Sequence, residues 1–209
     1  MQPITLLFSA LTLLILSTGC GPKVYESPEA ARLTDGHEII AVLPPVVSIK
    51  GRPKDDPEVL AQAAITDRDV FQREMYSWML RRKQQGRIRV EIQDVESTIA
   101  KLTRVGYFDE NILTPAELAE ELDVDAVVSS RYDMAKPMSE GAAIALGILF
   151  GAWGTTNQIK VNMTLHDRGT RSAIWNYDWV ANGSTFSSPD ALVEGLMRNA
   201  SRRMPYVVR

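Results

Sequence analysis

The 209-residue sequence contains a single cysteine, which excludes a disulfide within the chain and a metal site built from several cysteines. It also lacks an excess of either charge. Its 23 basic and 26 acidic residues leave a net charge of −3, which argues against a nucleic-acid-binding protein. Because 45% of the residues are hydrophobic and 23% are charged, the composition is that of an ordinary folded domain and not of a disordered chain.

Catalytic signatures are absent as well. The sequence has no phosphate-binding loop, nucleophile elbow, zinc-binding helix or calcium loop. Its two histidines, His37 and His166, are far apart, and solvated or hydrogen-bonded histidines are a better interpretation than a catalytic pair. The spacing of Asp133 and Glu140 does not assure a pair of carboxylates either. We therefore predict no catalytic residue, no metal site and no cofactor.

The first nineteen residues differ in kind from the rest. Residues 4–16 form an apolar block that is too short to span a bilayer but matches the core of a secretory signal peptide. Cys20 follows directly in "LSTGC", which resembles the lipobox of bacterial lipoproteins. The resemblance implies that residues 1–19 are removed and that Cys20 is acylated, with chains such as palmitate. The alternative is an ordinary signal peptide that ends near an unpaired thiol.

The segment after this cysteine is predicted to be a flexible tether. Residues 20–37 contain proline, glycine and charged residues without sustained periodicity. A flexible chain of this length has a root-mean-square span of roughly 20–25 Å, so the folded domain would work close to the membrane. Gly21 in place of an acidic residue is compatible, through the lipoprotein resemblance, with the outer membrane facing the periplasm.

Hydrophobic periodicity predicts one α/β domain over residues 38–209, with the element order β-α-β-α-β-β-β-α. Helices are expected from Asp56, from a capping box at Thr66–Asp69, from Asp94, from Thr114 and from Ser188. The second of these should end at Gly86 and bury Phe71, Met75, Trp78 and Met79. The five predicted strands are residues 38–45, which end in two prolines, and residues 87–93, 125–134, 158–166 and 172–181.

The last two strands alternate cleanly between apolar and polar residues. Ile159, Val161, Met163 and Leu165 alternate with Lys160, Asn162, Thr164 and His166, and Trp175, Tyr177 and Trp179 alternate with Asn176 and Asp178. A hairpin with one apolar and one polar face indicates that the helices lie mainly on one face of the mixed sheet. The polar face is then either simply solvated or a contact surface for a partner, through Lys160, Asn162, Asn176 and Asp178.

Three segments carry a family resemblance: "IIAVLPP", "VGYFDENILTPAELAEELDVDAVVSS" and "VNMTLHDRGTRSAIW". They are similar to landmark segments of the α/β lipoproteins that include the curli secretion channel lipoprotein, the penicillin-binding-protein activators and the N-terminal domain of the Tol translocation protein. The resemblance covers most of residues 38–203. It implies a single α/β domain that ends in a β-hairpin and a helix, and a role in the bacterial cell envelope.

A second group of polar residues is basic. Residues 81–83 read Arg-Arg-Lys, and Arg87 and Arg89 follow. Such a cluster can bind acidic headgroups or a glycan phosphate. More often it neutralises the C-terminal end of a helix and is solvated. The sequence leaves both interpretations open.

The apolar insertion at residues 141–154, "GAAIALGILFGAWG", carries no charge. As a helix it would be about 21 Å long, too short to span the roughly 30 Å hydrocarbon core. Small residues recur at Ala143, Gly147 and Gly151, a spacing that lets helices approach closely. One interpretation is burial within the monomer. The other is an insertion that contacts a second subunit or the membrane through Gly147, Ile148, Phe150, Gly151 and Trp153.

Together these patterns predict a membrane-anchored envelope lipoprotein that is not an enzyme. It would bind or assemble with envelope proteins or with further copies of itself, and would not bind nucleic acid. The alternative is a hydrolase of envelope glycan or lipid whose carboxylates are brought together only by the fold.

Overall fold

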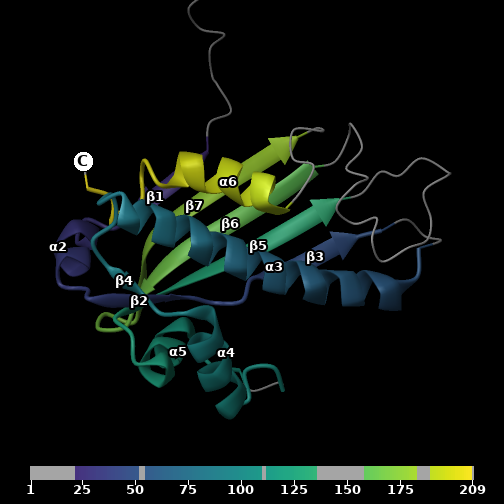
Figure 1. Ribbon diagram of the computed structural model, residues 1–209, viewed down its shortest axis with the longest axis horizontal. Helices are drawn as coiled ribbons and strands as arrows, with labels where there is room; N and C mark the ends of the chain where they lie inside the picture. The colour runs from purple at the N-terminus through teal and green to yellow at the C-terminus, as the bar shows by residue number, and fades with distance from the viewer. Residues whose placement is uncertain (1–21, 52–54, 110–111, 136–157, 183–188, 209) are drawn as a thin grey trace, which may run out of the picture.

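Seven strands form one mixed sheet in the order β1-β7-β6-β5-β2-β4, with β3 added beside β5 (Figure 1). The computed structural model describes residues 22–51, 55–109, 112–135, 158–182 and 189–208. The strands β2, β3, β4 and β5 pair in parallel, whereas β5, β6, β7 and β1 pair antiparallel. Their bounds are β1 Lys23–Glu26, β2 Ile39–Val42, β3 Val46–Lys50, β4 Glu91–Ile92, β5 Ala126–Ala135, β6 Gln158–Asp167 and β7 Ser172–Asn182.

The predicted hairpin is formed by β6 and β7, and its apolar face is core, as the alternation indicated. Leu165 lies opposite Trp175, and Met163 lies opposite Tyr177. All four side chains are fully buried. A bulge between Leu165 and His166 shifts the register by one residue near the turn.

Helix α3 (Pro57–Gln84) runs along the buried face of the sheet as one continuous helix. Its N-cap is Asp56, as predicted, and Phe71, Met75, Trp78 and Met79 are all buried. The predicted second start at residues 66–69 is wrong. The Thr66 hydroxyl donates to the carbonyl oxygen of Gln62 one turn earlier, so its side chain is part of the helix and does not cap a new one.

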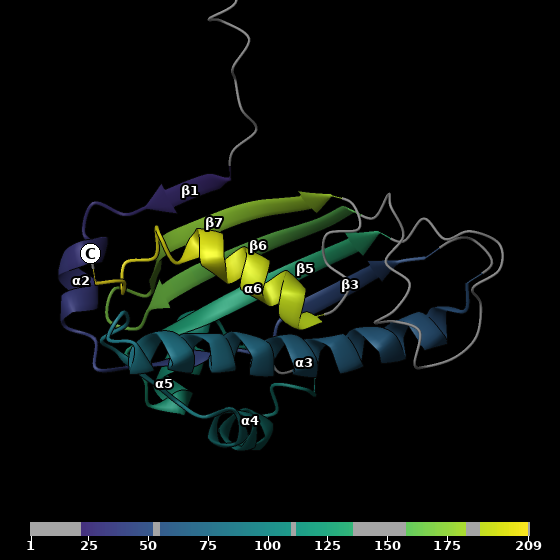
Figure 2. The same ribbon diagram turned by 45° about the horizontal axis from the view of Figure 1, so that its top comes forward.

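The C-terminal helix α6 (Pro189–Ala200) lies beside α3 on the same face (Figure 2). Leu192, Leu196 and Ala200 are fully buried, as their spacing predicted. Under the two helices, the rings of Phe71 and Tyr132 stack with their centroids 4.4 Å apart. This layer forms the larger of two hydrophobic clusters.

The opposite face of the sheet is covered at one end only, by α4 (Val95–Arg104) and α5 (Pro115–Leu122). Asp94 caps α4, and Thr114 forms a capping box with Glu117 at the start of α5, both as predicted. Leu118 and Leu122 pack with apolar side chains of β2 and β5 in a second, smaller cluster. The helices therefore lie mainly, but not only, on one face.

The predicted flexible tether over residues 20–37 is wrong for the residues that the structure describes. Strand β1 pairs with β7 at the edge of the sheet, and helix α2 (Ala30–Asp35) follows it (Figure 2). Val24 packs against the main core, and Ala30 is fully buried. The sequence did not reveal β1, because a four-residue edge strand with one inward side chain shows almost no alternation of apolar and polar residues.

Two other strands depart from the prediction. The two prolines after β2 interrupt the ladder without ending it, because β3 resumes pairing along the same side of β5 at Val46. The predicted strand at residues 87–93 shortens to β4, since Ile88 pairs instead with Val207 near the C-terminus.

Candidate functional site

The polar face of the sheet stays open beyond α4 and α5, and we name it the open face. It consists of the side chains that alternate with the core residues on five adjacent strands, as the register of the strands fixes. The residues are Lys23 and Tyr25 of β1, Asn176, Asp178 and Val180 of β7, Lys160, Asn162 and Thr164 of β6, Ser129, Arg131 and Asp133 of β5, and Val46, Ser48 and Lys50 of β3.

A chain of hydrogen bonds crosses the centre of the open face. The Asn176 amide donates to the Thr164 hydroxyl (2.8 Å), which donates to Asn162 Oδ1 (3.2 Å), and the Asn162 amide donates to Asp178 Oδ1 (2.7 Å). These bonds fix the rotamers of four neighbouring side chains on two strands. A partner that binds here therefore meets side chains that have already lost much of their conformational freedom.

Charge on the open face is mixed, with an excess of cations. Four cations and two carboxylates lie on it. In the register, Lys160 lies opposite Asp133, and Lys23 lies opposite Asp178. Lys50 and Arg131 are exposed without a carboxylate opposite them. A complementary partner surface would be rich in carboxylates or other acceptors.

Large apolar side chains interrupt this polar surface. Tyr25 is 53% exposed, and Val46 and Val180 are each 47% exposed. A tyrosine held on a strand offers a large contact area at a small cost in conformational entropy. The open face thus combines ordered polar groups with exposed apolar ones.

The predicted contact residues divide into two groups. Lys160, Asn162, Asn176 and Asp178 lie together at the centre of the open face. Cys20 and the insertion residues Gly147, Ile148, Phe150, Gly151 and Trp153 lie outside the described residues.

His37 has two buried partners that the sequence did not indicate. Its Nε2 atom lies 2.7 Å from Asp167 Oδ1, and its Nδ1 atom lies 2.5 Å from the Tyr206 hydroxyl. Because a carboxylate only accepts, Nε2–H donates to Asp167, and Nδ1 shares a second hydrogen bond with the Tyr206 hydroxyl. Asp167 Oδ2 also accepts from the backbone N–H and the hydroxyl of Thr170, at 2.5 and 2.7 Å.

This network resembles a catalytic relay but has the properties of a structural one. The side chains of His37 and Asp167 are only 7% and 4% exposed. Burial raises the pKa of the Tyr206 hydroxyl well above its usual range, and the nearby charges of Asp167 and Asp125 raise it further. Tyr206 is therefore neutral and a poor nucleophile. The network joins three distant parts of the chain.

Within the described residues, His166 forms a hydrogen bond with a serine hydroxyl and not with a carboxylate. His166 Nε2 lies 3.0 Å from the Ser129 hydroxyl, and burial lowers the pKa of its imidazole. Glu140, the suggested partner of Asp133, lies outside the described residues. Arg168 forms ion pairs with both Asp123 and Asp125, at 3.7 and 3.4 Å, and Asp125 also accepts the backbone N–H groups of Glu38 and Ile39.

The described residues hold neither a cluster of metal-ligating side chains nor a helix that could span a membrane. They contain no group of three or more histidine, cysteine, aspartate or glutamate side chains that could share a metal ion. None of their helices has both the length and the apolar composition that crossing a membrane requires.

No protein-family model matches the sequence, and no curated protein matches it significantly. Solved structures do match. The chain is similar to the PelC dodecamer from Paraburkholderia phytofirmans at 12% identity, over 90% of this chain and 98% of that one, with a TM-score of 0.40. It is similar to lipoprotein GNA1162 from Neisseria meningitidis at 12% identity, over 79% and 96%, with a TM-score of 0.43. It is also similar to the LpoB C-terminal domain from Salmonella enterica at 12% identity, over 74% and 93%, with a TM-score of 0.37.

Proposed function

We propose that this chain is a lipoprotein of the bacterial cell envelope that binds or assembles with other proteins and catalyses no reaction. Acylation of Cys20 would attach it to a membrane, in our proposal the outer membrane on its periplasmic side. The open face would be its contact surface. The ordered hydrogen bonds from Asn176 to Asp178 across the centre of that face carry the proposal.

The position of β1 supports a close attachment to the membrane. Only Gly21 and Pro22 stand between Cys20 and the first residue of β1. Three peptide units span at most about 11 Å when fully extended. An acylated Cys20 would therefore hold the β1 edge of the sheet close to the bilayer, and the open face would be presented in a restricted range of orientations.

Self-association through residues 141–154 is the second part of the proposal. The last residue of β5, Ala135, lies opposite the first residue of β6, Gln158, so a short hairpin loop would suffice to join them. The chain between these two residues is far longer than that. Long connections between neighbouring strands are usually functional. We therefore assign Gly147, Ile148, Phe150, Gly151 and Trp153 to contacts with another subunit or with the membrane.

The competing function, an envelope hydrolase, finds less support. Such an enzyme needs two close carboxylates, or a carboxylate beside a histidine, in an accessible cleft. The described residues offer Asp167 beside His37, but both groups are buried and committed to structural hydrogen bonds. Asp123 and Asp125 both form ion pairs with Arg168.

The proposal is tested by crosslinking in the native envelope, with the wild type and with Cys20→Ser. We expect the wild type in the membrane fraction with crosslinked protein partners, and Cys20→Ser as unprocessed precursor or released protein. A Cys20→Ser chain that is processed and membrane-bound like the wild type would exclude acylation as the anchor.

Charge reversal tests the open face separately. Lys160→Glu with Asp178→Lys should abolish the crosslinks while Tm changes little, because both side chains are exposed. The matched control is Arg104→Glu with Glu121→Lys, which reverses two exposed charges on α4 and α5. Identical crosslinks in both variants would exclude the open face as the contact surface.

A further inference from the structure

Arginines from two separate parts of the sequence gather at one end of the molecule. Helices α3 and α6 run in the same direction, so their C-terminal ends lie at the same end (Figures 1 and 2). The chain after α6 then pairs with the chain after α3. Ile88 bridges Val207, and the backbone N–H of Val208 donates to the Arg87 carbonyl oxygen at 3.1 Å. We name this end the basic pole; its exposed arginines are Arg81, Arg87, Arg89, Arg202 and Arg203.

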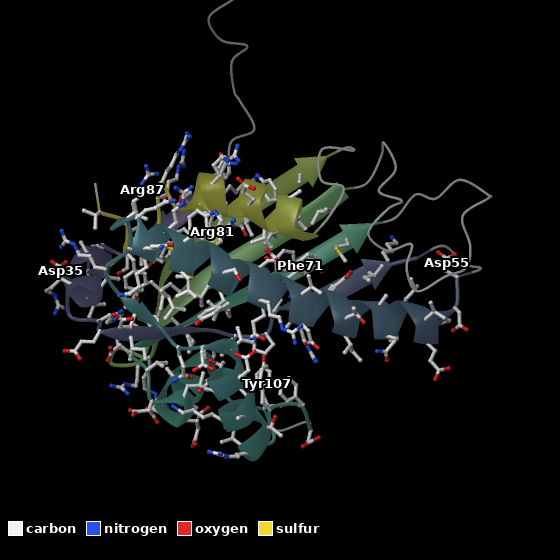
Figure 3. All side chains as sticks on the ribbon, in the orientation of Figure 1. Asp35, Asp55, Phe71, Arg81, Arg87 and Tyr107 are labelled. Carbon is white, nitrogen blue, oxygen red and sulfur yellow. The ribbon has the colours of Figure 1, made fainter. Side chains whose placement is uncertain are left out.

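The charges of the basic pole are not used inside the domain. Neighbouring cations do have partners, since Lys83 pairs with Glu91 at 2.6 Å and Arg198 pairs with Glu194 at 2.6 Å. Within the described residues, the five arginines of the basic pole form no ion pair. Arg81 and Arg87 extend from the surface near the end of α3 (Figure 3).

The helix dipole does not account for all of them. A cation stabilises a helix only within its last turn. Arg81 meets this condition in α3, whose last turn also holds Arg82 and Lys83. Arg87 and Arg89 follow the end of α3, and Arg202 and Arg203 follow the end of α6. At least four unpaired charges therefore call for another explanation.

The basic pole also lies near the place where the chain leaves for Cys20. Burial raises the pKa of Tyr177, and the positive charge of Arg203 at the pole partly offsets that rise. Tyr177 lies opposite Val24 of β1 in the sheet. Val24 is four residues after Cys20, a distance of at most about 14 Å along the chain.

We propose that the basic pole binds the phosphates of anionic phospholipids in the membrane to which Cys20 is attached. Guanidinium groups bind phosphate oxygens through bidentate hydrogen bonds. The electrostatic attractions of several such groups on one surface to a negatively charged bilayer are additive. The net charge of the whole chain is negative, so this attraction is local to the pole and would orient the domain. Arg89 lines a cleft formed with residues 34–37 and 205–208, and Asp35 is the acidic residue among those that line it.

The inference rests on the proposed membrane attachment, but its test does not. Both hydrophobic clusters lie within residues 24–207, so the chain from Gly21 onward contains the whole described core. This chain lacks Cys20 but keeps the uncharged residues 141–154, whose contact with a bilayer would not depend on anionic lipid, whereas binding by the basic pole would. Flotation with phosphatidylcholine vesicles, with and without phosphatidylglycerol, measures that binding. We expect binding that requires phosphatidylglycerol and is lost at high salt.

Variants at the pole decide the assignment. Each arginine near an anionic surface strengthens partitioning about 5-fold, so Arg202→Gln with Arg203→Gln should weaken it about 30-fold. Arg202→Lys with Arg203→Lys keeps the charge and should retain most of the binding. The control is Arg73→Gln with Arg104→Gln, which removes the same charge from exposed positions elsewhere.

Three results would overturn the proposal: no binding of the wild type to anionic vesicles, equal binding to neutral ones, or equal binding by the glutamine variants at the pole and at the control positions. A melting curve of each variant shows that it is folded. Because Cys20 is absent from this chain, failure here would leave its acylation and the role of the open face unaffected. Failure of Cys20→Ser to change membrane attachment in cells would, conversely, leave vesicle binding by the pole intact.

Discussion

The imidazole of His37 donates to the carboxylate of Asp167 over 2.7 Å, and the two residues are 130 positions apart in the sequence. With Tyr206 on the other ring nitrogen, this bond connects the segment before β2, the last residue of β6 and the C-terminal segment. All three side chains are buried, so each hydrogen bond replaces one that water would otherwise provide.

Removing the Tyr206 hydroxyl should therefore destabilise the domain. Tyr206→Phe leaves Nδ1 of His37 without a hydrogen-bond partner in a buried site, and we expect a loss of about 1–3 kcal/mol in the free energy of unfolding. Tyr177→Phe is the matched control, because the buried Tyr177 hydroxyl has no hydrogen-bond partner among the described residues. That change should be neutral or stabilising. Urea unfolding of both variants gives the comparison, and equal losses would contradict a structural role for the network.

Acid should weaken the same network. Burial alone would raise the pKa of Asp167, but the hydrogen bonds from the backbone and hydroxyl of Thr170 and from His37 outweigh it and lower the pKa. A lowered pKa means that the carboxylate stabilises the fold fully above its unfolded pKa of about 3.9, and that this contribution is lost as the pH falls through the lower, folded value.

The measurement is the free energy of unfolding as a function of pH for the wild type and Asp167→Asn. The gap between the two curves should be widest near neutral pH and should narrow below about pH 4. Asp94 and Glu117 also have lowered pKa values, through hydrogen bonds with Ser97 and Thr114, so the wild type keeps some pH dependence in either case. A difference in unfolding free energy that stays constant down to pH 3 would show that the charge of Asp167 does not contribute to stability.

The two faces of the hairpin should respond differently to truncation. Trp175 is fully buried, and Trp175→Ala should cost about 3–5 kcal/mol through lost contacts and a cavity. Asn162 is half-buried on the open face, and Asn162→Ala should cost less than about 1 kcal/mol. Thermal unfolding of the two variants checks this, and similar small losses would mean that the faces are assigned the wrong way round.

The apolar insertion gives a prediction about assembly. Gly147→Leu with Gly151→Leu should weaken self-association or membrane contact while the melting temperature stays close to that of the wild type, because bulk on the small-residue stripe keeps helices apart. Ala145→Leu, which lies off that stripe, is the control. Sedimentation of the chain with and without lipid vesicles measures both contacts. A monomer that ignores vesicles and unfolds on this replacement would place the insertion in the core.

The sequence predicted those helices and strands that have one buried face and one solvent-exposed face. The alternation around Met163 and Trp175 identified both strands of the hairpin and their core face. The capping residues Asp56, Asp94 and Thr114 identified three helix starts. In each case the residues that decide the structure are neighbours in the sequence, so their pattern can be read locally.

Where the decisive contacts are distant, the prediction failed. Strand β1 depends on pairing with β7, which is about 150 residues later, and only Val24 faces the core. Strand β3 follows the two prolines after β2, and it forms because β5 is long enough to pair with β3 as well as with β2. Ile88 was assigned to a longer strand because its pairing with Val207 is invisible in the local pattern.

The candidate site shows the same division. The central residues of the open face were predicted from alternation within β6 and β7, and the structure groups them as expected. The contributions of Tyr25 and Lys23 were missed together with β1. The partners of His37 could not be predicted, because Asp167 and Tyr206 reach it only through the folded chain.

Strand β1 also determines how the domain responds to a mechanical load. Any pull on the chain before residue 22 reaches the core first through the four residue pairs that β1 forms with β7. These pairs are backed by a single partly buried side chain, Val24, so β1 should peel away first and α2 next. The peeling should stop at His37, which Asp167 and Tyr206 hold in place. Up to about 50 Å of chain would then be released while the rest of the sheet stays folded.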